Sequence, residues 1–167
     1  LKPATGTPVM IPRQDMILGC YYLTFRLDIS RSPEGGKAKK SFGSSEEALL
    51  AYEAGVVLLQ EPIKIYIKKN LEETTAGRII FNESFPEDHP FFNDQVTAKK
   101  MESMVGNLVE KYSQKQVQEI LDSIKHLGFE YATKSGVSWG IDDLTVPKEK
   151  GALLQQAGVS RTAYYSL

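Results

Sequence analysis

The stretch 113–128, SQKQVQEILDSIKHLG, carries the clearest helical pattern in the chain. Its apolar residues recur at intervals of three and four, at Val117, Ile120, Leu121, Ile124 and Leu127. This spacing places them on one face, which predicts a helix packed against a core. Lys125 and His126 fall in the last predicted turn, where positive charge suits the helix dipole. Gly128 either ends this helix or interrupts it.

Strand patterns occur between the predicted helices. The stretch 62–69, PIKIYIKK, alternates isoleucines with Lys and Tyr and predicts a half-buried strand. The stretch 77–86, GRIIFNESFP, predicts a second strand that Pro86 ends. Shorter strands are expected at 9–11 and 40–43. Because helices and strands do not alternate regularly, the sequence predicts an α+β fold of mixed short strands and helices.

Other helices are predicted from their start signals. Asp15 stands where an N-cap should be, and the apolar spacing over 16–24 favours a short helix, although a strand also fits. Ser44 and Glu47 form a capping box before a helical face at Ala48, Leu49, Tyr52 and Val56. A polar helix is expected over 95–104 and a second helix over 105–111.

Length and composition limit the class of protein. A chain of 167 residues can form one domain with a real core. The 20 Lys and Arg against 21 Asp and Glu give a net charge of −1, without the basic excess typical of a nucleic-acid binder. The single Cys20 excludes an internal disulfide and fits a reducing compartment, and no zinc site is expected. No apolar run approaches the roughly 18 residues of a membrane span.

Signals for catalysis are sparse. His89 and His126 have no recognisable nucleophile or acid partner, so structural or solvated roles are expected. No phosphate-binding loop or dinucleotide fingerprint occurs. Asp142 and Asp143 could contribute to a Mg²⁺ site, but adjacent carboxylates on a strand point to opposite faces. The Gly-rich loop 30–40 is expected to be a solvated tip with basic residues at Lys37, Lys39 and Lys40.

Four segments carry more specific patterns. They are PVMIPRQDMILGCYYLT (8–24), TTAGRIIFNESFP (74–86), HPFFNDQVTAKKM (89–101) and LGFEYATKSGVSWGIDDLTVP (127–147). In this order they resemble the largest subunit of multisubunit RNA polymerases, the bacterial β′ subunit. The resemblance implies that residues 1–150 form the pore domain. Residues 151–167 would be the start of the funnel region or a divergent, truncated tail.

The resemblance also implies a function. In that family the pore domain lines the secondary channel, where nucleoside triphosphates enter and backtracked RNA 3′ ends leave. The implied activity is DNA-templated RNA synthesis, a nucleotidyltransferase reaction, within the assembled enzyme. Its Mg²⁺ ions are held by an aspartate loop that this chain lacks, and no metal site, zinc included, is implied here. The isolated chain is therefore expected to be inactive.

The implied partners are those of a transcribing polymerase. They are the β, α, ω and σ subunits, nucleoside triphosphates, the DNA template and the RNA 3′ end. No membrane partner is implied, and the expected location is the cytoplasm, associated with the nucleoid.

Several residues match family positions with known surroundings. Lys134 stands where the family has an arginine that faces the incoming triphosphate, and lysine keeps the charge but loses the bidentate fork. Gln14 matches a residue near the nucleotide site, and Arg13 replaces a common serine beside it. Arg78 is expected to form a structural ion pair, and Asn93 to cap a helix. A structural role in the Gly/Ser loop is expected for Gly136, Ser138, Gly140, Asp142 and Asp143.

One alternative function comes from a different class. The chain begins with Leu1 and lacks the aspartate loop, which indicates a fragment. A stand-alone, non-catalytic module or decoy derived from the polymerase would instead bind nucleotide or a secondary-channel factor. A domain cut from a large subunit should also expose apolar surface, here near Pro12 to Asp15 and at Tyr164 and Tyr165.

Overall fold

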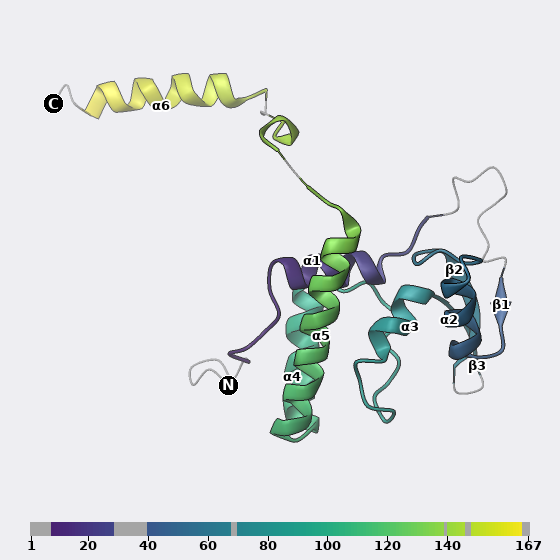
Figure 1. Ribbon diagram of the computed structural model, residues 1–167. Coiled ribbons are helices and arrows are strands. Elements are labelled where there is room, and N and C mark those ends of the chain that lie inside the picture. Colours follow the sequence, from purple (N-terminus) through teal and green to yellow (C-terminus); the bar gives the residue numbers. More distant parts are fainter. Residues whose placement is uncertain (1–7, 29–39, 68–69, 139, 146–147, 165–167) are drawn as a thin grey trace. The chain divides into compact units, whose positions relative to one another are not determined.

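The computed structural model describes residues 8–28, 40–67, 70–138, 140–145 and 148–164, with side chains described as far as residue 158. The elements are α1 (Asp15–Thr24), β1 (Ser41–Phe42), α2 (Ser45–Glu53), β2 (Pro62–Ile67), β3 (Asn70–Thr75), α3 (Ala76–Asn82), α4 (Ala98–Lys111), α5 (Gln114–Ser135), the 3-10 helix η2 (Ile141–Asp143) and α6 (Lys150–Tyr164). This mixture confirms the α+β class (Figure 1). Contacts divide the chain into two compact units, Leu1–Gly136 and Val137–Leu167.

The sheet has the order β1-β2-β3. β1 is parallel to β2, whereas β2 and β3 form an antiparallel hairpin. Ile63 and Ile65 are fully buried and Tyr66 is exposed, which confirms the predicted half-buried strand. The strand expected at 40–43 is present as β1. The buried isoleucines form the smaller of two cores, with Ala48, Val57 and Ile79.

The larger core joins α1, α3, α4 and α5. Its fully buried side chains include Cys20, Leu23, Phe81, Val96, Met101, Val105 and Ile124. The predicted face of the 113–128 helix takes part, because Val117, Ile120 and Ile124 are buried. Ser113 begins α5 with a capping box in which its backbone N–H donates to the Gln116 side chain at 3.1 Å.

α1 crosses α5 at two glycines (Figure 1). A Cβ added to Gly19 would lie 1.8 Å from the carbonyl oxygen of Gly128. A Cβ added to Gly128 would lie 2.6 Å from the carbonyl oxygen of Met16. Any side chain here would separate the two helices, so glycine is needed for close approach and not for a turn. Gly128 therefore interrupts the apolar pattern without ending the helix, which continues to Ser135.

The prediction of a strand over 77–86 is wrong, because the chain forms the helix α3 over Ala76–Asn82. The Thr75 hydroxyl accepts the Arg78 backbone N–H at 3.2 Å and caps the helix. Ile79 and Phe81 then reach the two cores from one short helix. The strand is instead the segment just before α3. This segment is β3, with the polar sequence NLEETT, and it pairs along its whole length with β2. Its cross-strand pairs, such as Lys64 with Glu73, compensate for its low apolar content.

The two helices expected over 95–104 and 105–111 are a single helix, α4. Thr97 caps it by accepting the Lys100 backbone N–H at 3.3 Å. Gly106 does not break it, because a helix tolerates one glycine at a cost of about 1 kcal/mol. The strand expected at 9–11 is also absent, since this segment has no ladder partner among the described residues.

The predicted caps are partly correct. The helix expected over 16–24 is present as α1, but Asp15 is its first residue and Gln14 occupies the N-cap position. Ser44 caps α2 as predicted and accepts the Glu47 backbone N–H at 3.2 Å. The Glu47 carboxylate reaches one residue further than expected and accepts the Gly43 N–H at 2.6 Å. Lys37 and Lys39 of the predicted basic tip lie outside the described residues.

Candidate functional site

Lys134 lies in the last turn of α5 and not in a loop. The sequence indicated a Gly/Ser loop around Lys134, but residues 131–135 are helical. The Thr133 and Ser135 hydroxyls donate to backbone carbonyls of the preceding turn at 2.9 and 2.7 Å, so these residues are compatible with the helix. Gly136 then ends α5 in the left-handed conformation, with φ 59°.

The Lys134 ammonium has two partners on its own helix. Its Nζ donates to Glu130 Oε1 at 2.6 Å, and it lies 4.7 Å from the centre of the Tyr131 ring. Both side chains of the ion pair are about half exposed. The Glu130 carboxylate raises the pKa of Lys134, with partial burial opposing it. The C-terminal end of α5 also favours a cation, so the local field stabilises the charged ammonium.

Tyr131 is a buried aromatic residue near the C-terminal end of α5, next to Lys134. Its side chain is 4% exposed, and burial raises the pKa of its hydroxyl, with Tyr52 on α2 adding to the shift. The tyrosine is therefore neutral at any physiological pH. The Lys134 ammonium lies over this ring, with the stem of the side chain along the helix.

The Arg13 and Gln14 side chains lie exposed just before α1. Gln14 has φ 51° and ψ −120°, a conformation that non-glycine residues rarely adopt, and its side chain makes no capping bond. Such strain costs about 1–3 kcal/mol and persists where the surroundings impose it. Here Pro12 is buried on one side and α1 packs on α5 on the other.

Arg13 and Gln14 directly precede α1, the helix that crosses α5 at Gly128. Met16 contacts Gly128, and Lys134 follows six residues later, about 9 Å along the helix. No hydrogen bond or ion pair between described residues joins Arg13 or Gln14 to Lys134. Among the described residues, these three side chains therefore form no contact network.

The acidic residues after α5 belong to the second unit. Asp142 and Asp143 lie on the 3-10 helix η2 and not on a strand, which corrects the local structure assumed for them. Asp143 Oδ2 accepts the Gly140 backbone N–H at 2.7 Å and fixes this turn. Ser138 and Asp142 are exposed. Among the described residues, no group of three or more His, Cys, Asp and Glu side chains could hold a metal ion.

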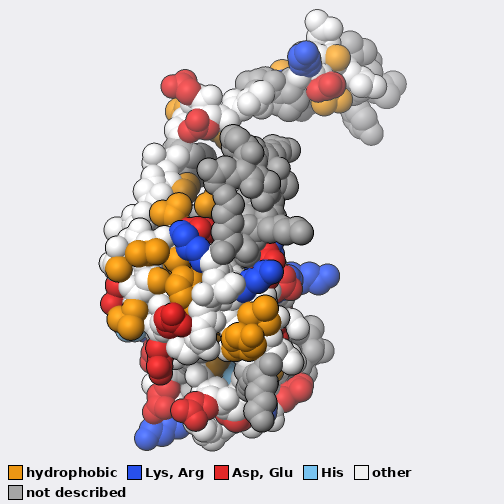
Figure 2. Space-filling view, turned by 90° about the vertical axis from the view of Figure 1, so that its right-hand side faces the viewer, with side chains coloured by type: hydrophobic (Ala, Val, Ile, Leu, Met, Phe, Trp, Pro, Cys, Tyr) orange, Lys and Arg blue, Asp and Glu red, His pale blue; other side chains and the backbone are white. Residues whose placement is uncertain are grey.

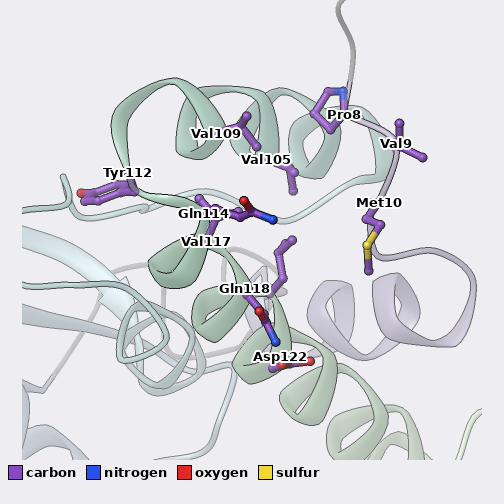
Figure 3. A pocket seen from close by; sticks show the side chains of 11 residues that line it. Pro8, Val9, Met10, Val105, Val109, Tyr112, Gln114, Val117, Gln118 and Asp122 are labelled. Carbon is purple, nitrogen blue, oxygen red and sulfur yellow. The ribbon is translucent and has the colours of Figure 1, made fainter. Parts of the chain in front are cut away.

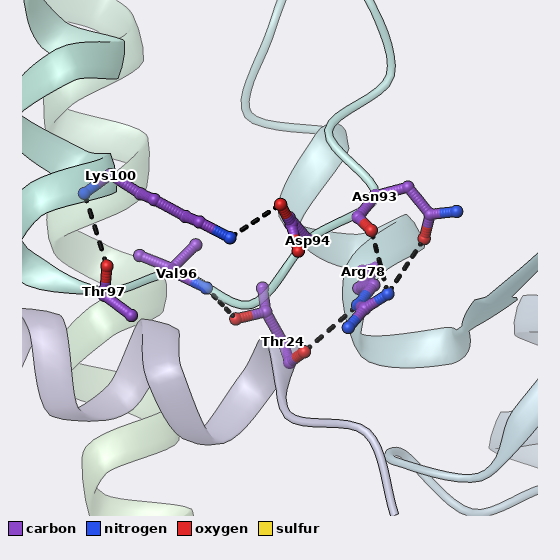
Figure 4. Close-up of polar contacts among 7 residues, drawn as sticks. All are labelled: Thr24, Arg78, Asn93, Asp94, Val96, Thr97 and Lys100. Carbon is purple, nitrogen blue, oxygen red and sulfur yellow. Dashed lines mark hydrogen bonds and ion pairs between the residues drawn. The ribbon is translucent and has the colours of Figure 1, made fainter.

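Arg78 is the centre of a buried polar network (Figure 4). Its guanidinium donates to the Thr24 carbonyl at 3.1 Å and to the Asn93 carbonyl and side-chain oxygen at 2.9 and 3.1 Å. Burial lowers its pKa from the usual value, followed by the nearby Arg26 charge. Arg78 was expected on a strand in an ion pair, but it lies on α3 and its hydrogen-bond partners are neutral oxygens.

Asn93 does not cap a helix, which corrects the second expectation. Its side-chain amide donates to the Glu73 carbonyl at 2.9 Å while its oxygen accepts from Arg78. Thr24 extends the network, because its hydroxyl accepts the Val96 N–H at 2.8 Å. Arg78 and Asn93 thus connect α1, α3, β3 and the segment before α4, and their role is structural.

Comparison with known proteins decides the family. The family described as RNA polymerase Rpb1, domain 3, matches residues 1–144. The DNA-directed RNA polymerase subunit beta′ of Sulfurihydrogenibium sp. is 44% identical over 94% of this chain. The subunits of the same name from Desulforudis audaxviator and Aquifex pyrophilus are 41% and 40% identical over the same share. The chain belongs to the family of the bacterial RNA polymerase β′ subunit. It spans 10–13% of the length of these three β′ subunits.

Membership in the β′ family gives a context for the exposed apolar residues. α4, α5 and the segment before α1 enclose a hollow of about 690 Å³, lined by Val105, Val109, Val117 and Leu121 among others (Figure 3). Val9 and Met10 at its edge are 61% and 77% exposed, as predicted for the Pro12–Asp15 region. Hydrophobic side chains also lie exposed among charged ones on the face in Figure 2. Tyr165 and the side chain of Tyr164 lie outside the described residues.

Glu130 and Tyr131 are the site residues that sequence reasoning missed. Glu130 precedes Lys134 by four residues, the spacing of a helical ion pair, but this signal has meaning only once the segment is recognised as helical. The two histidines take no part in this region: His89 stacks on Phe85 with ring centres 4.5 Å apart, and His126 is exposed. No helix in the described parts of the chain is long and apolar enough to cross a membrane.

Proposed function

We propose that this chain is part of the wall of the polymerase secondary channel. In the assembled enzyme it guides nucleoside triphosphates to the site of DNA-templated RNA synthesis and leaves a path for backtracked RNA 3′ ends. The observation that carries this proposal is Lys134, a half-exposed cation at the family position that faces the triphosphate. Membership in the β′ family supports the setting.

Lys134 acts through charge. Its ammonium holds three donors on one nitrogen, so it neutralises phosphate oxygens without the planar fork of an arginine. Gln14 offers a neutral amide and Arg13 a second cation near the nucleotide. Mg²⁺ ions in the whole enzyme would stabilise the charge that develops during nucleotidyl transfer, and the resemblance places their ligands outside this chain. The chain alone is accordingly expected to add no nucleotide to RNA.

Assembly with the β, α, ω and σ subunits accounts for the apolar surface near Met10 and the hollow beside α4 and α5. Patches of this kind are typical of surfaces that other protein covers. The DNA template and the RNA 3′ end would be contacted by the complex as a whole. The expected location is therefore that of the transcribing enzyme, in the cytoplasm at the nucleoid.

The test is transcript extension by reconstituted polymerase. A complete β′ subunit carrying this segment is assembled with its partners, with Lys134 intact or changed to Ala. Loss of one charged phosphate contact is expected to raise KM for nucleoside triphosphates about tenfold, with a smaller effect on kcat. Lys125→Ala is the matched control, since Lys125 is a similarly exposed lysine paired with Asp122 on the same helix. Equal KM values for Lys134→Ala and the intact enzyme would refute the role of Lys134.

A further inference from the structure

The Lys134 ammonium is not free to meet a ligand, because it already has a carboxylate partner. Glu130 Oε1 lies 2.6 Å from Lys134 Nζ. Glutamate four residues before lysine is the more favourable order for a helical ion pair. Glu130 makes no other hydrogen bond or ion pair among the described residues, so its carboxylate is dedicated to this lysine.

Two further features hold the ammonium in this position. Nζ lies over the Tyr131 ring, 4.7 Å from its centre, within the range of a cation–π contact. The C-terminal end of α5 carries the negative end of the helix dipole. All three favour the lysine where it is, and two of them, the carboxylate and the dipole, repel a phosphate that approaches it.

We propose that Glu130 is a positioning residue that holds Lys134 in a resting arrangement and weakens triphosphate binding until the ion pair opens. This inference rests on the proposed function of Lys134. A triphosphate must draw the ammonium from Glu130 before it gains the full contact. Glu130 thereby sets the nucleoside triphosphate concentration at which this part of the channel fills, without touching the reacting atoms.

The lysine itself makes this competition possible. A single nitrogen cannot serve a carboxylate and a phosphate in two directions as well as a guanidinium can, because a guanidinium has five donors spread over a plane. Restoring the family residue with Lys134→Arg should therefore reduce the influence of Glu130. Both side chains are about half exposed, so these substitutions leave the core of the fold unchanged.

A double-mutant cycle in reconstituted polymerase tests the inference. The β′ subunit carries Glu130→Gln, Lys134→Ala or both, and KM and kcat for nucleoside triphosphates are measured at low salt. Glu130→Gln is expected to lower KM about twofold, the size of an exposed i,i+4 pair, with kcat unchanged. In the Lys134→Ala background the same change should have no effect. Glu119→Gln is the control, because Glu119 pairs with Lys115 on the same helix, at 4.0 Å.

The outcomes separate the two proposals. If Lys134→Ala leaves KM unchanged, the role of Lys134 is wrong and the inference about Glu130 falls with it. If Lys134→Ala raises KM and Glu130→Gln does not lower it, only the inference about Glu130 is overturned. A similar drop in KM from Glu119→Gln, or from Glu130→Gln when Lys134 is absent, would show a general charge effect and also overturn it. A loss of the Glu130→Gln effect in Lys134→Arg polymerase would support the competition for a single nitrogen.

Discussion

Arg78 and Lys134 are two cations at positions that match the same family, yet they lie in opposite surroundings. Arg78 is 8% exposed and donates to three neutral oxygens from two segments of the chain. Lys134 is about half exposed and bonds one carboxylate on its own helix. Arg78 donates to oxygens of two neighbouring segments inside the fold, whereas Lys134 lies at the surface, and among the described residues it has one ionic partner that it can exchange.

The difference separates a cation that builds the fold from one that can act at its surface. Removing Arg78 would leave buried oxygens without donors, which costs far more than the loss of an exposed pair. Removing Lys134 frees one solvated carboxylate and little else. Stability measurements should therefore respond to Arg78, and nucleotide measurements to Lys134.

The largest effect is expected from a substitution that forces apart α1 and α5, the helices that carry Thr24 of the Arg78 network and Lys134. Gly128→Ala places a Cβ 2.6 Å from a backbone oxygen of α1, and neither backbone can yield easily. We expect a loss of about 4 kcal/mol in the free energy of unfolding, measured by urea denaturation of the 167-residue chain. Gly106→Ala is the control, because nothing lies within 4 Å of its added Cβ, and it should stabilise α4 by up to about 1 kcal/mol. Equal effects of the two changes would contradict the close crossing.

Arg78→Met tests the buried side of the comparison. The apolar replacement keeps the length of the side chain but leaves three accepting oxygens without their donor. We expect a loss of about 3 kcal/mol in the free energy of unfolding, measured by the same urea titration. A loss below about 1 kcal/mol would mean that water replaces the guanidinium and that the network is not a structural centre.

Gln14→Gly sharpens the comparison on the functional side. Glycine adopts φ 51° without strain, so the chain should gain about 1 kcal/mol of stability after its higher unfolded-state entropy is subtracted. Gln14→Ala keeps the strain and should gain nothing. If the two variants unfold at the same urea concentration, Gln14 is not strained. Increased stability together with weaker nucleotide use in the polymerase would identify the side chain as functional.

The smallest stability effect is expected at Lys134 itself. Lys134→Met should cost about 0.4 kcal/mol, because an exposed i,i+4 pair contributes little. Glu130 raises the pKa of Lys134 in the folded chain, so this contribution is complete below the lysine pKa of the unfolded chain. It is lost as pH rises through the raised value of the folded chain. The difference between variant and original chain should therefore vanish at strongly alkaline pH and in about 1 M salt. If Lys134→Met lowers the free energy of unfolding by more than about 1 kcal/mol, Lys134 is a structural cation like Arg78.

Sequence reasoning succeeded where one periodicity dominates. The face of α5 and the alternation of β2 follow directly from their apolar residues, and both were predicted. It failed at 70–86, because the polar β3 is held by pairing with β2 and the apolar α3 is too short to show a helical period. Tertiary contacts determine the structure of both segments, and the local sequence pattern does not reveal these contacts.

The resemblance named candidate site residues, but the sequence did not predict the local structure that holds them. Resemblance pointed to Lys134 and Gln14, and the sequence placed Lys134 in a loop rich in Gly and Ser, while Gly128 was expected either to end the preceding helix or to interrupt it. Gly128 instead allows α1 to pack closely on α5. The helix α5 therefore continues past Gly128, and Lys134 lies on it, one turn after Glu130. A contact between distant segments thus determined the local structure of the site.

Cys20 makes this chain convenient for site-directed labelling. It is the only thiol, it is fully buried between α1 and α5, and burial raises its pKa to about 12. Thiol reagents attack the thiolate, so in the folded chain Cys20 should be almost inert. A second cysteine introduced at an exposed position would accept a fluorophore or spin label selectively, without removal of the native thiol. The same buried sulfur would then report unfolding, since it becomes reactive only when the two helices part.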